Sequence, residues 1–313
     1  MKNTFIKYLD NKRFYTFNCF LKNKFNSKVF KVSLNAGMTC PNRDGTKSTG
    51  GCSFCSGNLS GDFGGDPCES IHQQFDEIRM RVHKKWPDAL YIAYFQAGTN
   101  TYAPVDKLKE LYNSVIEFPN VVGLCIATRP DCLSDEICDL LKELTKRTYL
   151  IVELGLQTIH DETDKRINRC HTYKNFLDGY DMLSSRGINI CVHIINGLPG
   201  ETKEMMLETT RSVASLKPHS IKIHLLHIIK GTRICDEYEK GEFKAMEFSD
   251  YISLVCDQLE ILPPDTVIQR LTGDGDKKTL VAPLWSNNKR NVLNSIDKEM
   301  LRRNSIQGLR YNN

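Results

Sequence analysis

The chain has 313 residues, 40% of them hydrophobic and 26% charged, which is typical of a soluble globular protein with one large domain or two small ones. No apolar stretch approaches the length needed to cross a bilayer, and Lys2 and Lys7 interrupt the N-terminus before an apolar run forms. The sequence therefore predicts a cytoplasmic protein without a membrane segment or a secretory signal. Its 12 cysteines then favour a reducing compartment over a disulfide framework.

Basic residues are concentrated at the two ends of the chain. Residues 1–31 carry eight Lys or Arg against one acidic residue, and residues 289–313 carry six against two, although the net charge is only +4. Both ends can offer positive surface to a polyanion, with Lys22, Lys24 and Lys28 contacting phosphates, or they can merely solubilise exposed segments. The aromatic residues between the N-terminal lysines suit packing across the floor of a domain better than base stacking; they are Phe14, Tyr15, Phe17, Phe20, Phe25 and Phe30.

From residue 29 onward, short apolar or β-branched runs alternate with amphipathic runs, which indicates alternating strands and helices. Strands are predicted at 29–34, 90–95, 121–127, 150–156, 188–195 and 221–228, with a possible seventh at 267–270. Helices are predicted after the N-caps Asp66, Ser134 and Thr202, after Pro104, and near 173–186 and 249–262. In the first of these, Pro67 would occupy the first helical position.

Such alternation predicts parallel strands joined by right-handed crossovers. We therefore expect an α/β fold, a partial (β/α)6 barrel of the TIM type whose functional loops follow the carboxyl ends of the strands. Residues 1–28 are predicted to pack on this barrel as a basic N-terminal segment, residues 29–235 to form its core, and residues 236–313 to form a C-terminal extension or cap. The polar loops after successive strands should converge on one mouth; they include 96–100, 128–131, 157–161 and 196–201.

Three cysteines, Cys40, Cys52 and Cys55, stand in a CX11CX2C spacing in the loop after the first predicted strand. The last two are close enough for both sulfurs to face one metal centre, and the glycines of the loop let the backbone bring the first cysteine to them. A structural zinc site could recruit Cys68 as a fourth ligand, but that residue has no close cysteine neighbour. The other interpretation is an iron–sulfur cluster with three protein ligands, which leaves one iron open to chemistry.

Four motifs in chain order carry a family resemblance. They are the cysteine loop, Tyr-Phe-Gln-Ala-Gly-Thr-Asn-Thr-Tyr at 94–102, Glu-Leu-Gly-Leu-Gln-Thr at 153–158 and Gly-Leu-Pro-Gly-Glu at 197–201. With them the chain resembles, nearly end to end, the YhcC/YtqA (MnmL-like) group of the radical SAM superfamily. It is also similar to the radical SAM core of the Elongator catalytic subunit, whose long cysteine spacing and Thr-Arg-Pro-Asp segment it shares at 128–131.

The resemblance implies the cofactors and the fold of the radical SAM type. A 4Fe-4S cluster would be bound by Cys40, Cys52 and Cys55, with S-adenosylmethionine (SAM) on the open iron. Reductive cleavage of SAM would then give a 5′-deoxyadenosyl radical that abstracts hydrogen from a substrate. The protein would have to orient and shield this chemistry.

The resemblance also implies several cofactor-binding residues. Gln96 stands where relatives carry a Gly-Gly-Glu-like turn that holds the SAM amino group, a departure from their pattern. Arg169 stands where a basic residue meets the SAM carboxylate, although Cys170 replaces an expected glycine. Arg129 and Asp131 are candidates for the ribose or the substrate, and Asn196 begins a loop expected at the mouth.

Glu153 is the candidate catalytic residue, because it lies on a strand predicted to line the barrel interior. There it could accept hydrogen bonds from the SAM ribose or from a substrate. The alternative is a buried glutamate paired with a neighbouring arginine. His193, His224 and His227 fall in apolar runs and are more typical of core histidines than of ligands.

For function, the resemblance implies tRNA as the partner and modification of the wobble uridine, from 5-carboxymethylaminomethyluridine toward 5-aminomethyluridine. A reduced flavodoxin- or ferredoxin-type protein would supply the electron. Two alternatives stay open: a radical SAM enzyme acting on a small molecule or a protein side chain, and a zinc-stabilised RNA-binding module.

Overall fold

The computed structural model describes residues 10–57, 59, 61, 64–273 and 275–311. Residues 1–9 of the predicted N-terminal segment, with Lys2 and Lys7, lie outside the described residues, as do 312–313 at the other end. Among the helices that are described, none has the length and apolar composition needed to cross a membrane.

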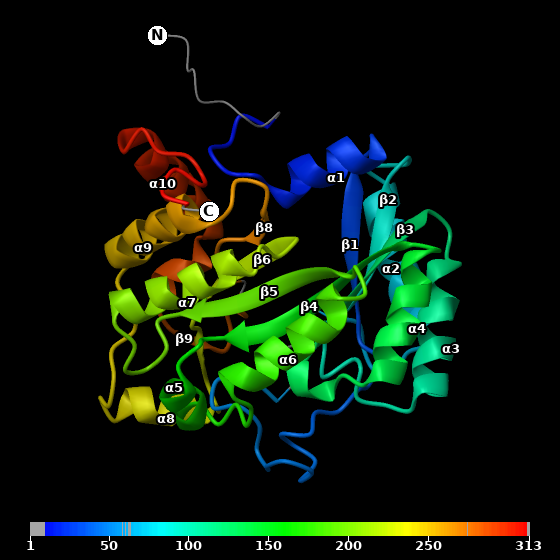
Figure 1. Cartoon of the computed structure of the whole chain (residues 1–313), viewed down its shortest axis with the longest axis horizontal. Coiled ribbons are helices and arrows are strands. Elements are labelled where there is room, and N and C mark those ends of the chain that lie inside the picture. Colours follow the sequence, from blue (N-terminus) through cyan, green and yellow to red (C-terminus); the bar gives the residue numbers. More distant parts are fainter. Residues whose placement is uncertain (1–9, 58, 60, 62–63, 274, 312–313) are drawn as a thin grey trace.

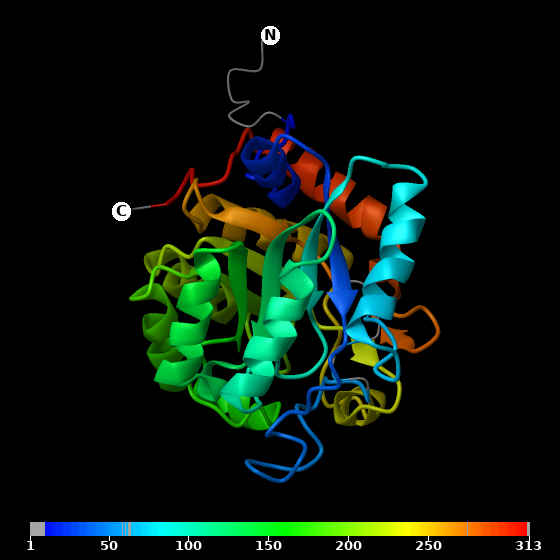
Figure 2. The same ribbon diagram turned by 90° about the vertical axis from the view of Figure 1, so that its right-hand side faces the viewer.

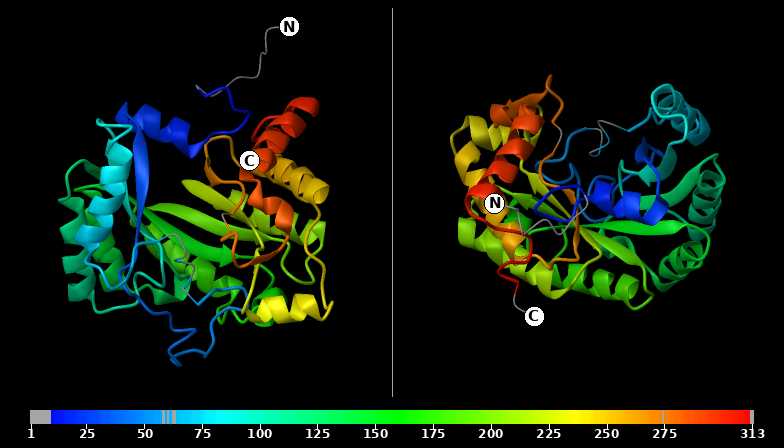
Figure 3. Two further views of the ribbon diagram at one scale, coloured as in Figure 1. Left: turned by 180° about the vertical axis from the view of Figure 1, so that it is seen from behind. Right: turned by 90° about the horizontal axis from the view of Figure 1, so that it is seen from above.

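The centre of the fold is a sheet of seven parallel strands that curls into a half-barrel (Figure 1; Figure 3). The strands follow one another across the sheet in chain order, and each neighbouring pair is parallel. They are β1 (Val29–Leu34), β2 (Leu90–Phe95), β3 (Val121–Thr128), β4 (Tyr149–Gln157), β5 (Asn189–Asn196), β6 (Ser220–Leu225) and β8 (Val267–Arg270). The predicted α/β half-barrel is thus confirmed, and the strand at 267–270 extends its sheet to seven strands.

Helices cover the outer face of the sheet, with the main apolar core between the two layers. The helices after the successive strands are α2 (Ile71–His83), α3 (Val105–Ile116), α4 (Asp135–Thr145), α6 (Tyr173–Ser184), α7 (Lys203–Ser215), α9 (Phe248–Ile261) and α10 (Lys289–Arg302). Short helices are α5 (Asp161–Arg166) and α8 (Arg233–Glu239). Ser134 and Thr202 cap α4 and α7 as predicted, since each side chain accepts a hydrogen bond from the backbone three residues on.

The predicted start of α2 was wrong. The helix begins after Ser70, whose hydroxyl accepts from the backbone of Gln73 while the Gln73 side chain bonds back to the cap. Asp66 instead accepts a hydrogen bond from the Cys68 backbone in a local turn. The reciprocal capping box therefore lies four residues beyond the Asp-Pro pair that suggested a helix start.

Helix α1 (Phe17–Phe25) closes the end of the barrel at which the strands begin (Figures 1 and 2). Its aromatic side chains pack on the interior face of the strands, and the Phe20 ring lies 5.7 Å from that of Tyr149. This is the packing across the floor that the interleaved aromatic residues indicated. The cysteine loop lies at the opposite end of the barrel, so the site must open away from α1.

Strand β6 is shorter than predicted. It ends at Leu225, and the Leu226 backbone makes one more bond beside this end, donating to the Asn196 carbonyl at 2.9 Å. The next residues form β7 (Ile228–Ile229), which pairs in antiparallel fashion with β9 (Leu280–Ala282). Two 3-10 turns, Pro130–Cys132 and Leu284–Asn287, complete the described elements.

Candidate active site

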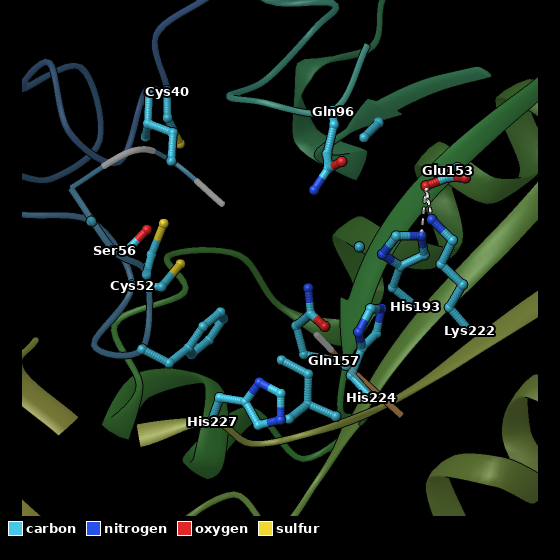
Figure 4. A pocket seen from close by; sticks show the side chains of 18 of the residues that line it. Cys40, Cys52, Ser56, Gln96, Glu153, Gln157, His193, Lys222, His224 and His227 are labelled. Atoms are coloured by element: carbon cyan, nitrogen blue, oxygen red, sulfur yellow. Dashed lines mark hydrogen bonds and ion pairs between the residues drawn. The ribbon is translucent and has the colours of Figure 1, made fainter. Parts of the chain in front are cut away.

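The interior of the half-barrel contains a cavity of about 300 Å³. It is lined by the cysteine loop and by side chains from β2 to β6 and β8, so that loops and strand interiors contribute to one site. Figure 4 shows Cys40 and Cys52 on one side of it and Glu153, His193 and Lys222 on the other. We refer to these as the cysteine side (Cys40, Cys52, Cys55, Arg43, Arg129, Arg169) and the lysine side (Lys31, Glu153, His193, Lys222).

The cysteine loop is held in place by side chains that bond to its backbone. Arg43 donates to the carbonyls of Cys55 (3.0 Å) and Ser56, and Asn168 donates to the Gly51 carbonyl at 2.8 Å. Gly51 has a φ of +79°, and a Cβ there would lie 2.7 Å from Arg43 Nε, so only glycine allows this close approach. These contacts bring Cys40, Cys52 and Cys55 to the wall of the same cavity.

The loop after β2 packs directly beneath the start of the cysteine loop. The Thr99 backbone donates to the Thr39 carbonyl at 3.0 Å, and a Cβ on Gly98 would lie 2.1 Å from the Met38 carbonyl oxygen. The same loop places Gln96 on the cavity wall. The Gln-Ala-Gly-Thr sequence thus sets the distance between strand β2 and the first cysteine.

Two buried arginines, Arg129 and Arg169, connect the cysteine loop to neighbouring strands and loops. Arg169 donates to the Gly155 carbonyl at 2.8 Å and lies 3.8 Å from Cys52 Sγ. Arg129 donates to the Arg169 carbonyl at 3.0 Å and forms a two-pronged ion pair with Asp131 at 2.9 Å. Burial would raise the pKa of Asp131, but its bonds with Arg129 and Lys47 outweigh burial and hold the pKa well below its usual range.

The lysine side is a buried ion-pair cluster. Glu153 is fully buried; one carboxylate oxygen lies 2.6 Å from Lys31 Nζ, and the other lies 2.5 Å from Lys222 Nζ and 3.1 Å from His193 Nε2. Burial would raise the pKa of Glu153, but the two lysine charges and the His193 hydrogen bond lower it well below its ordinary value. The carboxylate therefore stays ionised at neutral pH.

Glu153, Cys191 and His193 also form the one group of at least three possible metal ligands that converge among the described residues, with ligand atoms within 4.8 Å of one another. An ammonium group already contacts each oxygen of Glu153. Burial together with neighbouring charge raises the pKa of the Cys191 thiol to about 12, so it stays protonated. Both features disfavour a cation at this position.

Family models cover almost the whole sheet. The model of the Radical SAM superfamily matches residues 40–213, and that of the Radical_SAM C-terminal domain matches residues 218–302. The chain belongs to the radical SAM superfamily. It is 52% identical over 297 residues to protein YtqA of Bacillus subtilis, covering 95% of this chain and 92% of that one.

More distant relatives agree with this membership. Protein YhcC of Escherichia coli is 36% identical over 289 residues, covering 92% of each chain. The solved structure of Elp3 from Methanocaldococcus infernus superimposes with a TM-score of 0.67, covering 90% of this chain and 64% of that one. At 20% identity this last likeness shows the shared fold.

The cofactors of this radical SAM chain are a 4Fe-4S cluster and SAM, and the residues present fit them. Three thiols, which are soft ligands suited to iron–sulfur clusters, line one cavity. Several residues that line this cavity have a buried polar atom without a hydrogen-bond partner among the described residues; the atoms are Arg43 Nε, Gln157 Oε1, Arg169 Nε and His224 Nε2. Such atoms are uncommon in a finished interior and are typical of a site that a ligand completes.

In the radical SAM site, the three cysteines would hold the cluster, and the bound pair of cofactors supplies a 5′-deoxyadenosyl radical. The chain itself orients the loop through Arg43, Asn168 and Arg169. Four further predicted residues also lie at the cavity wall: Gln96, Arg129, Glu153 and Arg169. Their individual cofactor contacts remain predictions.

Two predicted site residues do not line the cavity. Asn196 donates to and accepts from the Gln258 side chain at 2.8 and 2.9 Å, so both atoms of its amide are used in a buried network behind the strand. Asp131 bonds to Lys47 and to Arg129, and it holds the Arg129 side chain in place at the cavity wall. The arrangement of Glu153 corresponds to the alternative of a paired buried glutamate, with two lysines in place of the arginine.

Sequence reasoning singled out Glu153 but missed the two lysines that pair with it, and it misplaced three histidines. His193, His224 and His227 were expected in the core, yet all three line the cavity, as does Lys222. The signal was a period of two: Lys222 and His224 alternate with isoleucines in β6, which marks one polar face on an otherwise buried strand. Gln157, at a φ of +75° at the end of β4, also lines the cavity and was not singled out.

Proposed function

We propose that this radical SAM enzyme modifies the wobble uridine of tRNA, taking 5-carboxymethylaminomethyluridine toward 5-aminomethyluridine. What carries the choice of substrate is a partial match to the tRNA uridine(34) acetyltransferase of Methanocaldococcus jannaschii, which is 31% identical over 157 residues. That match covers 49% of this chain and 28% of that protein. The specific reaction is supported by the resemblance to the MnmL-like group.

The proposal places the target base in the cavity between the cysteine side and the lysine side. The mouth lies at the carboxyl ends of the strands, where a flipped-out base can enter. A reduced flavodoxin- or ferredoxin-type protein would supply the electron in the cytoplasm.

The described part of the basic N-terminal segment, residues 10–28, does not lie at this mouth. Lys24 and Lys28 are on or beside α1, at the floor of the barrel; Lys24 Nζ lies 4.7 Å from the Tyr149 ring centre, and Lys28 donates to Asn18 at 2.9 Å. A tRNA whose anticodon enters the mouth would have to extend along the outside of the barrel to contact them. Their role in phosphate binding therefore stays a separate prediction.

Nucleoside mass spectrometry of tRNA tests the proposal. In a strain that lacks the protein, 5-carboxymethylaminomethyluridine should accumulate, and the wild-type chain but not Cys52→Ala should restore its conversion. Unchanged wobble nucleosides in the deletion strain would overturn the tRNA assignment. In that event, SAM cleavage by the purified protein would point to a small-molecule or protein side-chain substrate.

A further inference from the structure

The lysine side of the cavity contains two ammonium groups and one carboxylate. Lys31 on β1 and Lys222 on β6 both contact Glu153, and their other hydrogen-bond partners, Gln269 at 2.8 Å and Tyr94 at 3.2 Å, are neutral. Only 7% of the Lys222 side chain and none of that of Glu153 is exposed. Burying an excess cation is costly unless a partner meets it, so this cluster is suited to an anion.

The titratable neighbours agree with a positive local potential. Burial, followed by the charges of Lys222 and Lys31 acting against Glu153, lowers the pKa of His193 to about 4. Burial and nearby positive groups likewise hold the pKa of His224 well below its usual range. Both imidazoles are therefore neutral at pH 7, and neither changes the net positive charge of the cluster.

Lys222 is the member of the cluster placed to meet a ligand. It lines the cavity, whereas Lys31 lies behind it against the Phe17 and Tyr94 rings. An ammonium group has three N–H donors; those of Lys222 that are used within the chain go to Glu153 and Tyr94. Within the part of the chain that the structure describes, this leaves one donor of a residue on the cavity wall for a ligand.

We propose that Lys222 binds a carboxylate carried by the substrate, with Glu153 and Lys31 as positioning residues that hold its ammonium group in place. The inference rests on the proposed function, because 5-carboxymethylaminomethyluridine carries a carboxylate and its aminomethyl product does not. It assigns the lysine side to recognition of the group that distinguishes substrate from product. The arginines of the cysteine side bond to the cysteine loop and its neighbours, and so belong to the other half of the site.

Binding of three anticodon stem-loops tests this inference without relying on turnover. They differ only at the wobble position, which carries uridine, 5-carboxymethylaminomethyluridine or the methyl ester of the latter. Fluorescence anisotropy with the anaerobically purified holoenzyme should show the carboxylate form bound about tenfold more tightly than the ester, as a charge-assisted hydrogen bond predicts. Lys222→Met should remove this preference, and Lys222→Arg should retain part of it.

Controls separate recognition from folding and from the proposed function. Lys109→Met, at an exposed position on α3, makes the same change outside the cavity and should leave the preference intact. Equal binding of carboxylate and ester by the wild type would overturn the inference even if no variant folded. If both forms also bound more tightly than the unmodified stem-loop, the proposed function would stand; equal binding of all three would contradict both.

Discussion

The two sides of the cavity are built in different ways. The cysteine side is built on loops with left-handed residues at Gly50, Gly51 and Asn168, and its buried Arg43 Nε and Arg169 Nε have no partner among the described residues. The lysine side consists of regular strands, and every oxygen of Glu153 is bonded. The difference indicates that the fold alone assembles the ion pairs around Glu153, whereas we expect the cofactors to complete the cysteine side.

Cys52→Ala should give the largest effect on activity. The change should prevent cofactor binding and leave the stability of the cofactor-free protein nearly unchanged. Removing one of three cluster ligands should abolish both the visible absorbance of the cluster and the release of 5′-deoxyadenosine, since three ligands are the minimum here. The free energy of unfolding of the cofactor-free protein should change by less than ~1 kcal/mol. Absorbance spectroscopy, chromatography of released 5′-deoxyadenosine and urea denaturation measure the three quantities, and iron analysis confirms the loss of the cluster.

Cys68→Ala is the matched control, because this cysteine is exposed and outside the cavity. It should leave iron content and SAM cleavage unchanged. A Cys52→Ala protein that kept full turnover would refute the assigned ligands.

Glu153→Gln should show the reverse pattern, a loss of stability even without cofactors. The change leaves two buried ammonium groups beside a neutral amide, and breaking a buried ion pair in this way costs about 3 kcal/mol. Urea denaturation of the cofactor-free protein measures the cost. Glu143→Gln makes the same substitution in an exposed pair with Lys146 and should change the unfolding free energy by less than ~0.5 kcal/mol. Equal stabilities of the two variants would show that the lysine side is not preassembled.

The contrast between the cysteine side and the lysine side also explains which features the sequence could predict. Strands such as 29–34 and 90–95 were predicted with their observed bounds, because apolar runs bounded by polar loops report on burial directly. The convergence of the three cysteines on one cavity was predictable because they share a single glycine-bearing loop. The pairing of Glu153 with Lys31 and Lys222 was not, because the three residues lie on strands that do not neighbour one another in the sheet. Only the curl of the half-barrel brings them together.

Carboxylate recognition by Lys222 should weaken as the pH rises. Burial, opposed by Glu153, lowers the pKa of Lys222 to about 8, so its positive charge is lost between pH 7 and pH 9. The charged and titratable groups that face it are Lys31, Tyr94, Glu153, Cys191, His193 and Arg270. The pKa shifts of Lys31, Tyr94, Glu153, Cys191 and His193 keep each of these five groups in one protonation state over this range. The preference for the carboxylate stem-loop over its ester should fall about tenfold from pH 7 to pH 9. A constant preference in anisotropy titrations would contradict the role of this ammonium group.

Asp164→Asn should give the smallest effect and a gain in stability. Asp164 is buried near Arg169 of the cysteine side, and burial raises the pKa of its carboxyl to about 7, although the charge of Arg169 acts to lower it. In the unfolded chain this carboxyl ionises near pH 4. The contribution of the Asp164 carboxyl to the stability of the protein is therefore fully present below that pH and is lost as the pH rises through 7.

At pH 8 the free energy of unfolding of the cofactor-free asparagine variant, measured by urea denaturation, should therefore exceed that of the wild type by ~1–2 kcal/mol. This difference in stability should disappear as the pH falls toward 4. Arg169 keeps its bond to the Gly155 carbonyl in either case, so the loop should not shift. A variant that is less stable at pH 8 would show that the carboxylate has a partner in solution. In that case the cysteine side would be as fully bonded before loading as the lysine side, and the contrast between them would disappear.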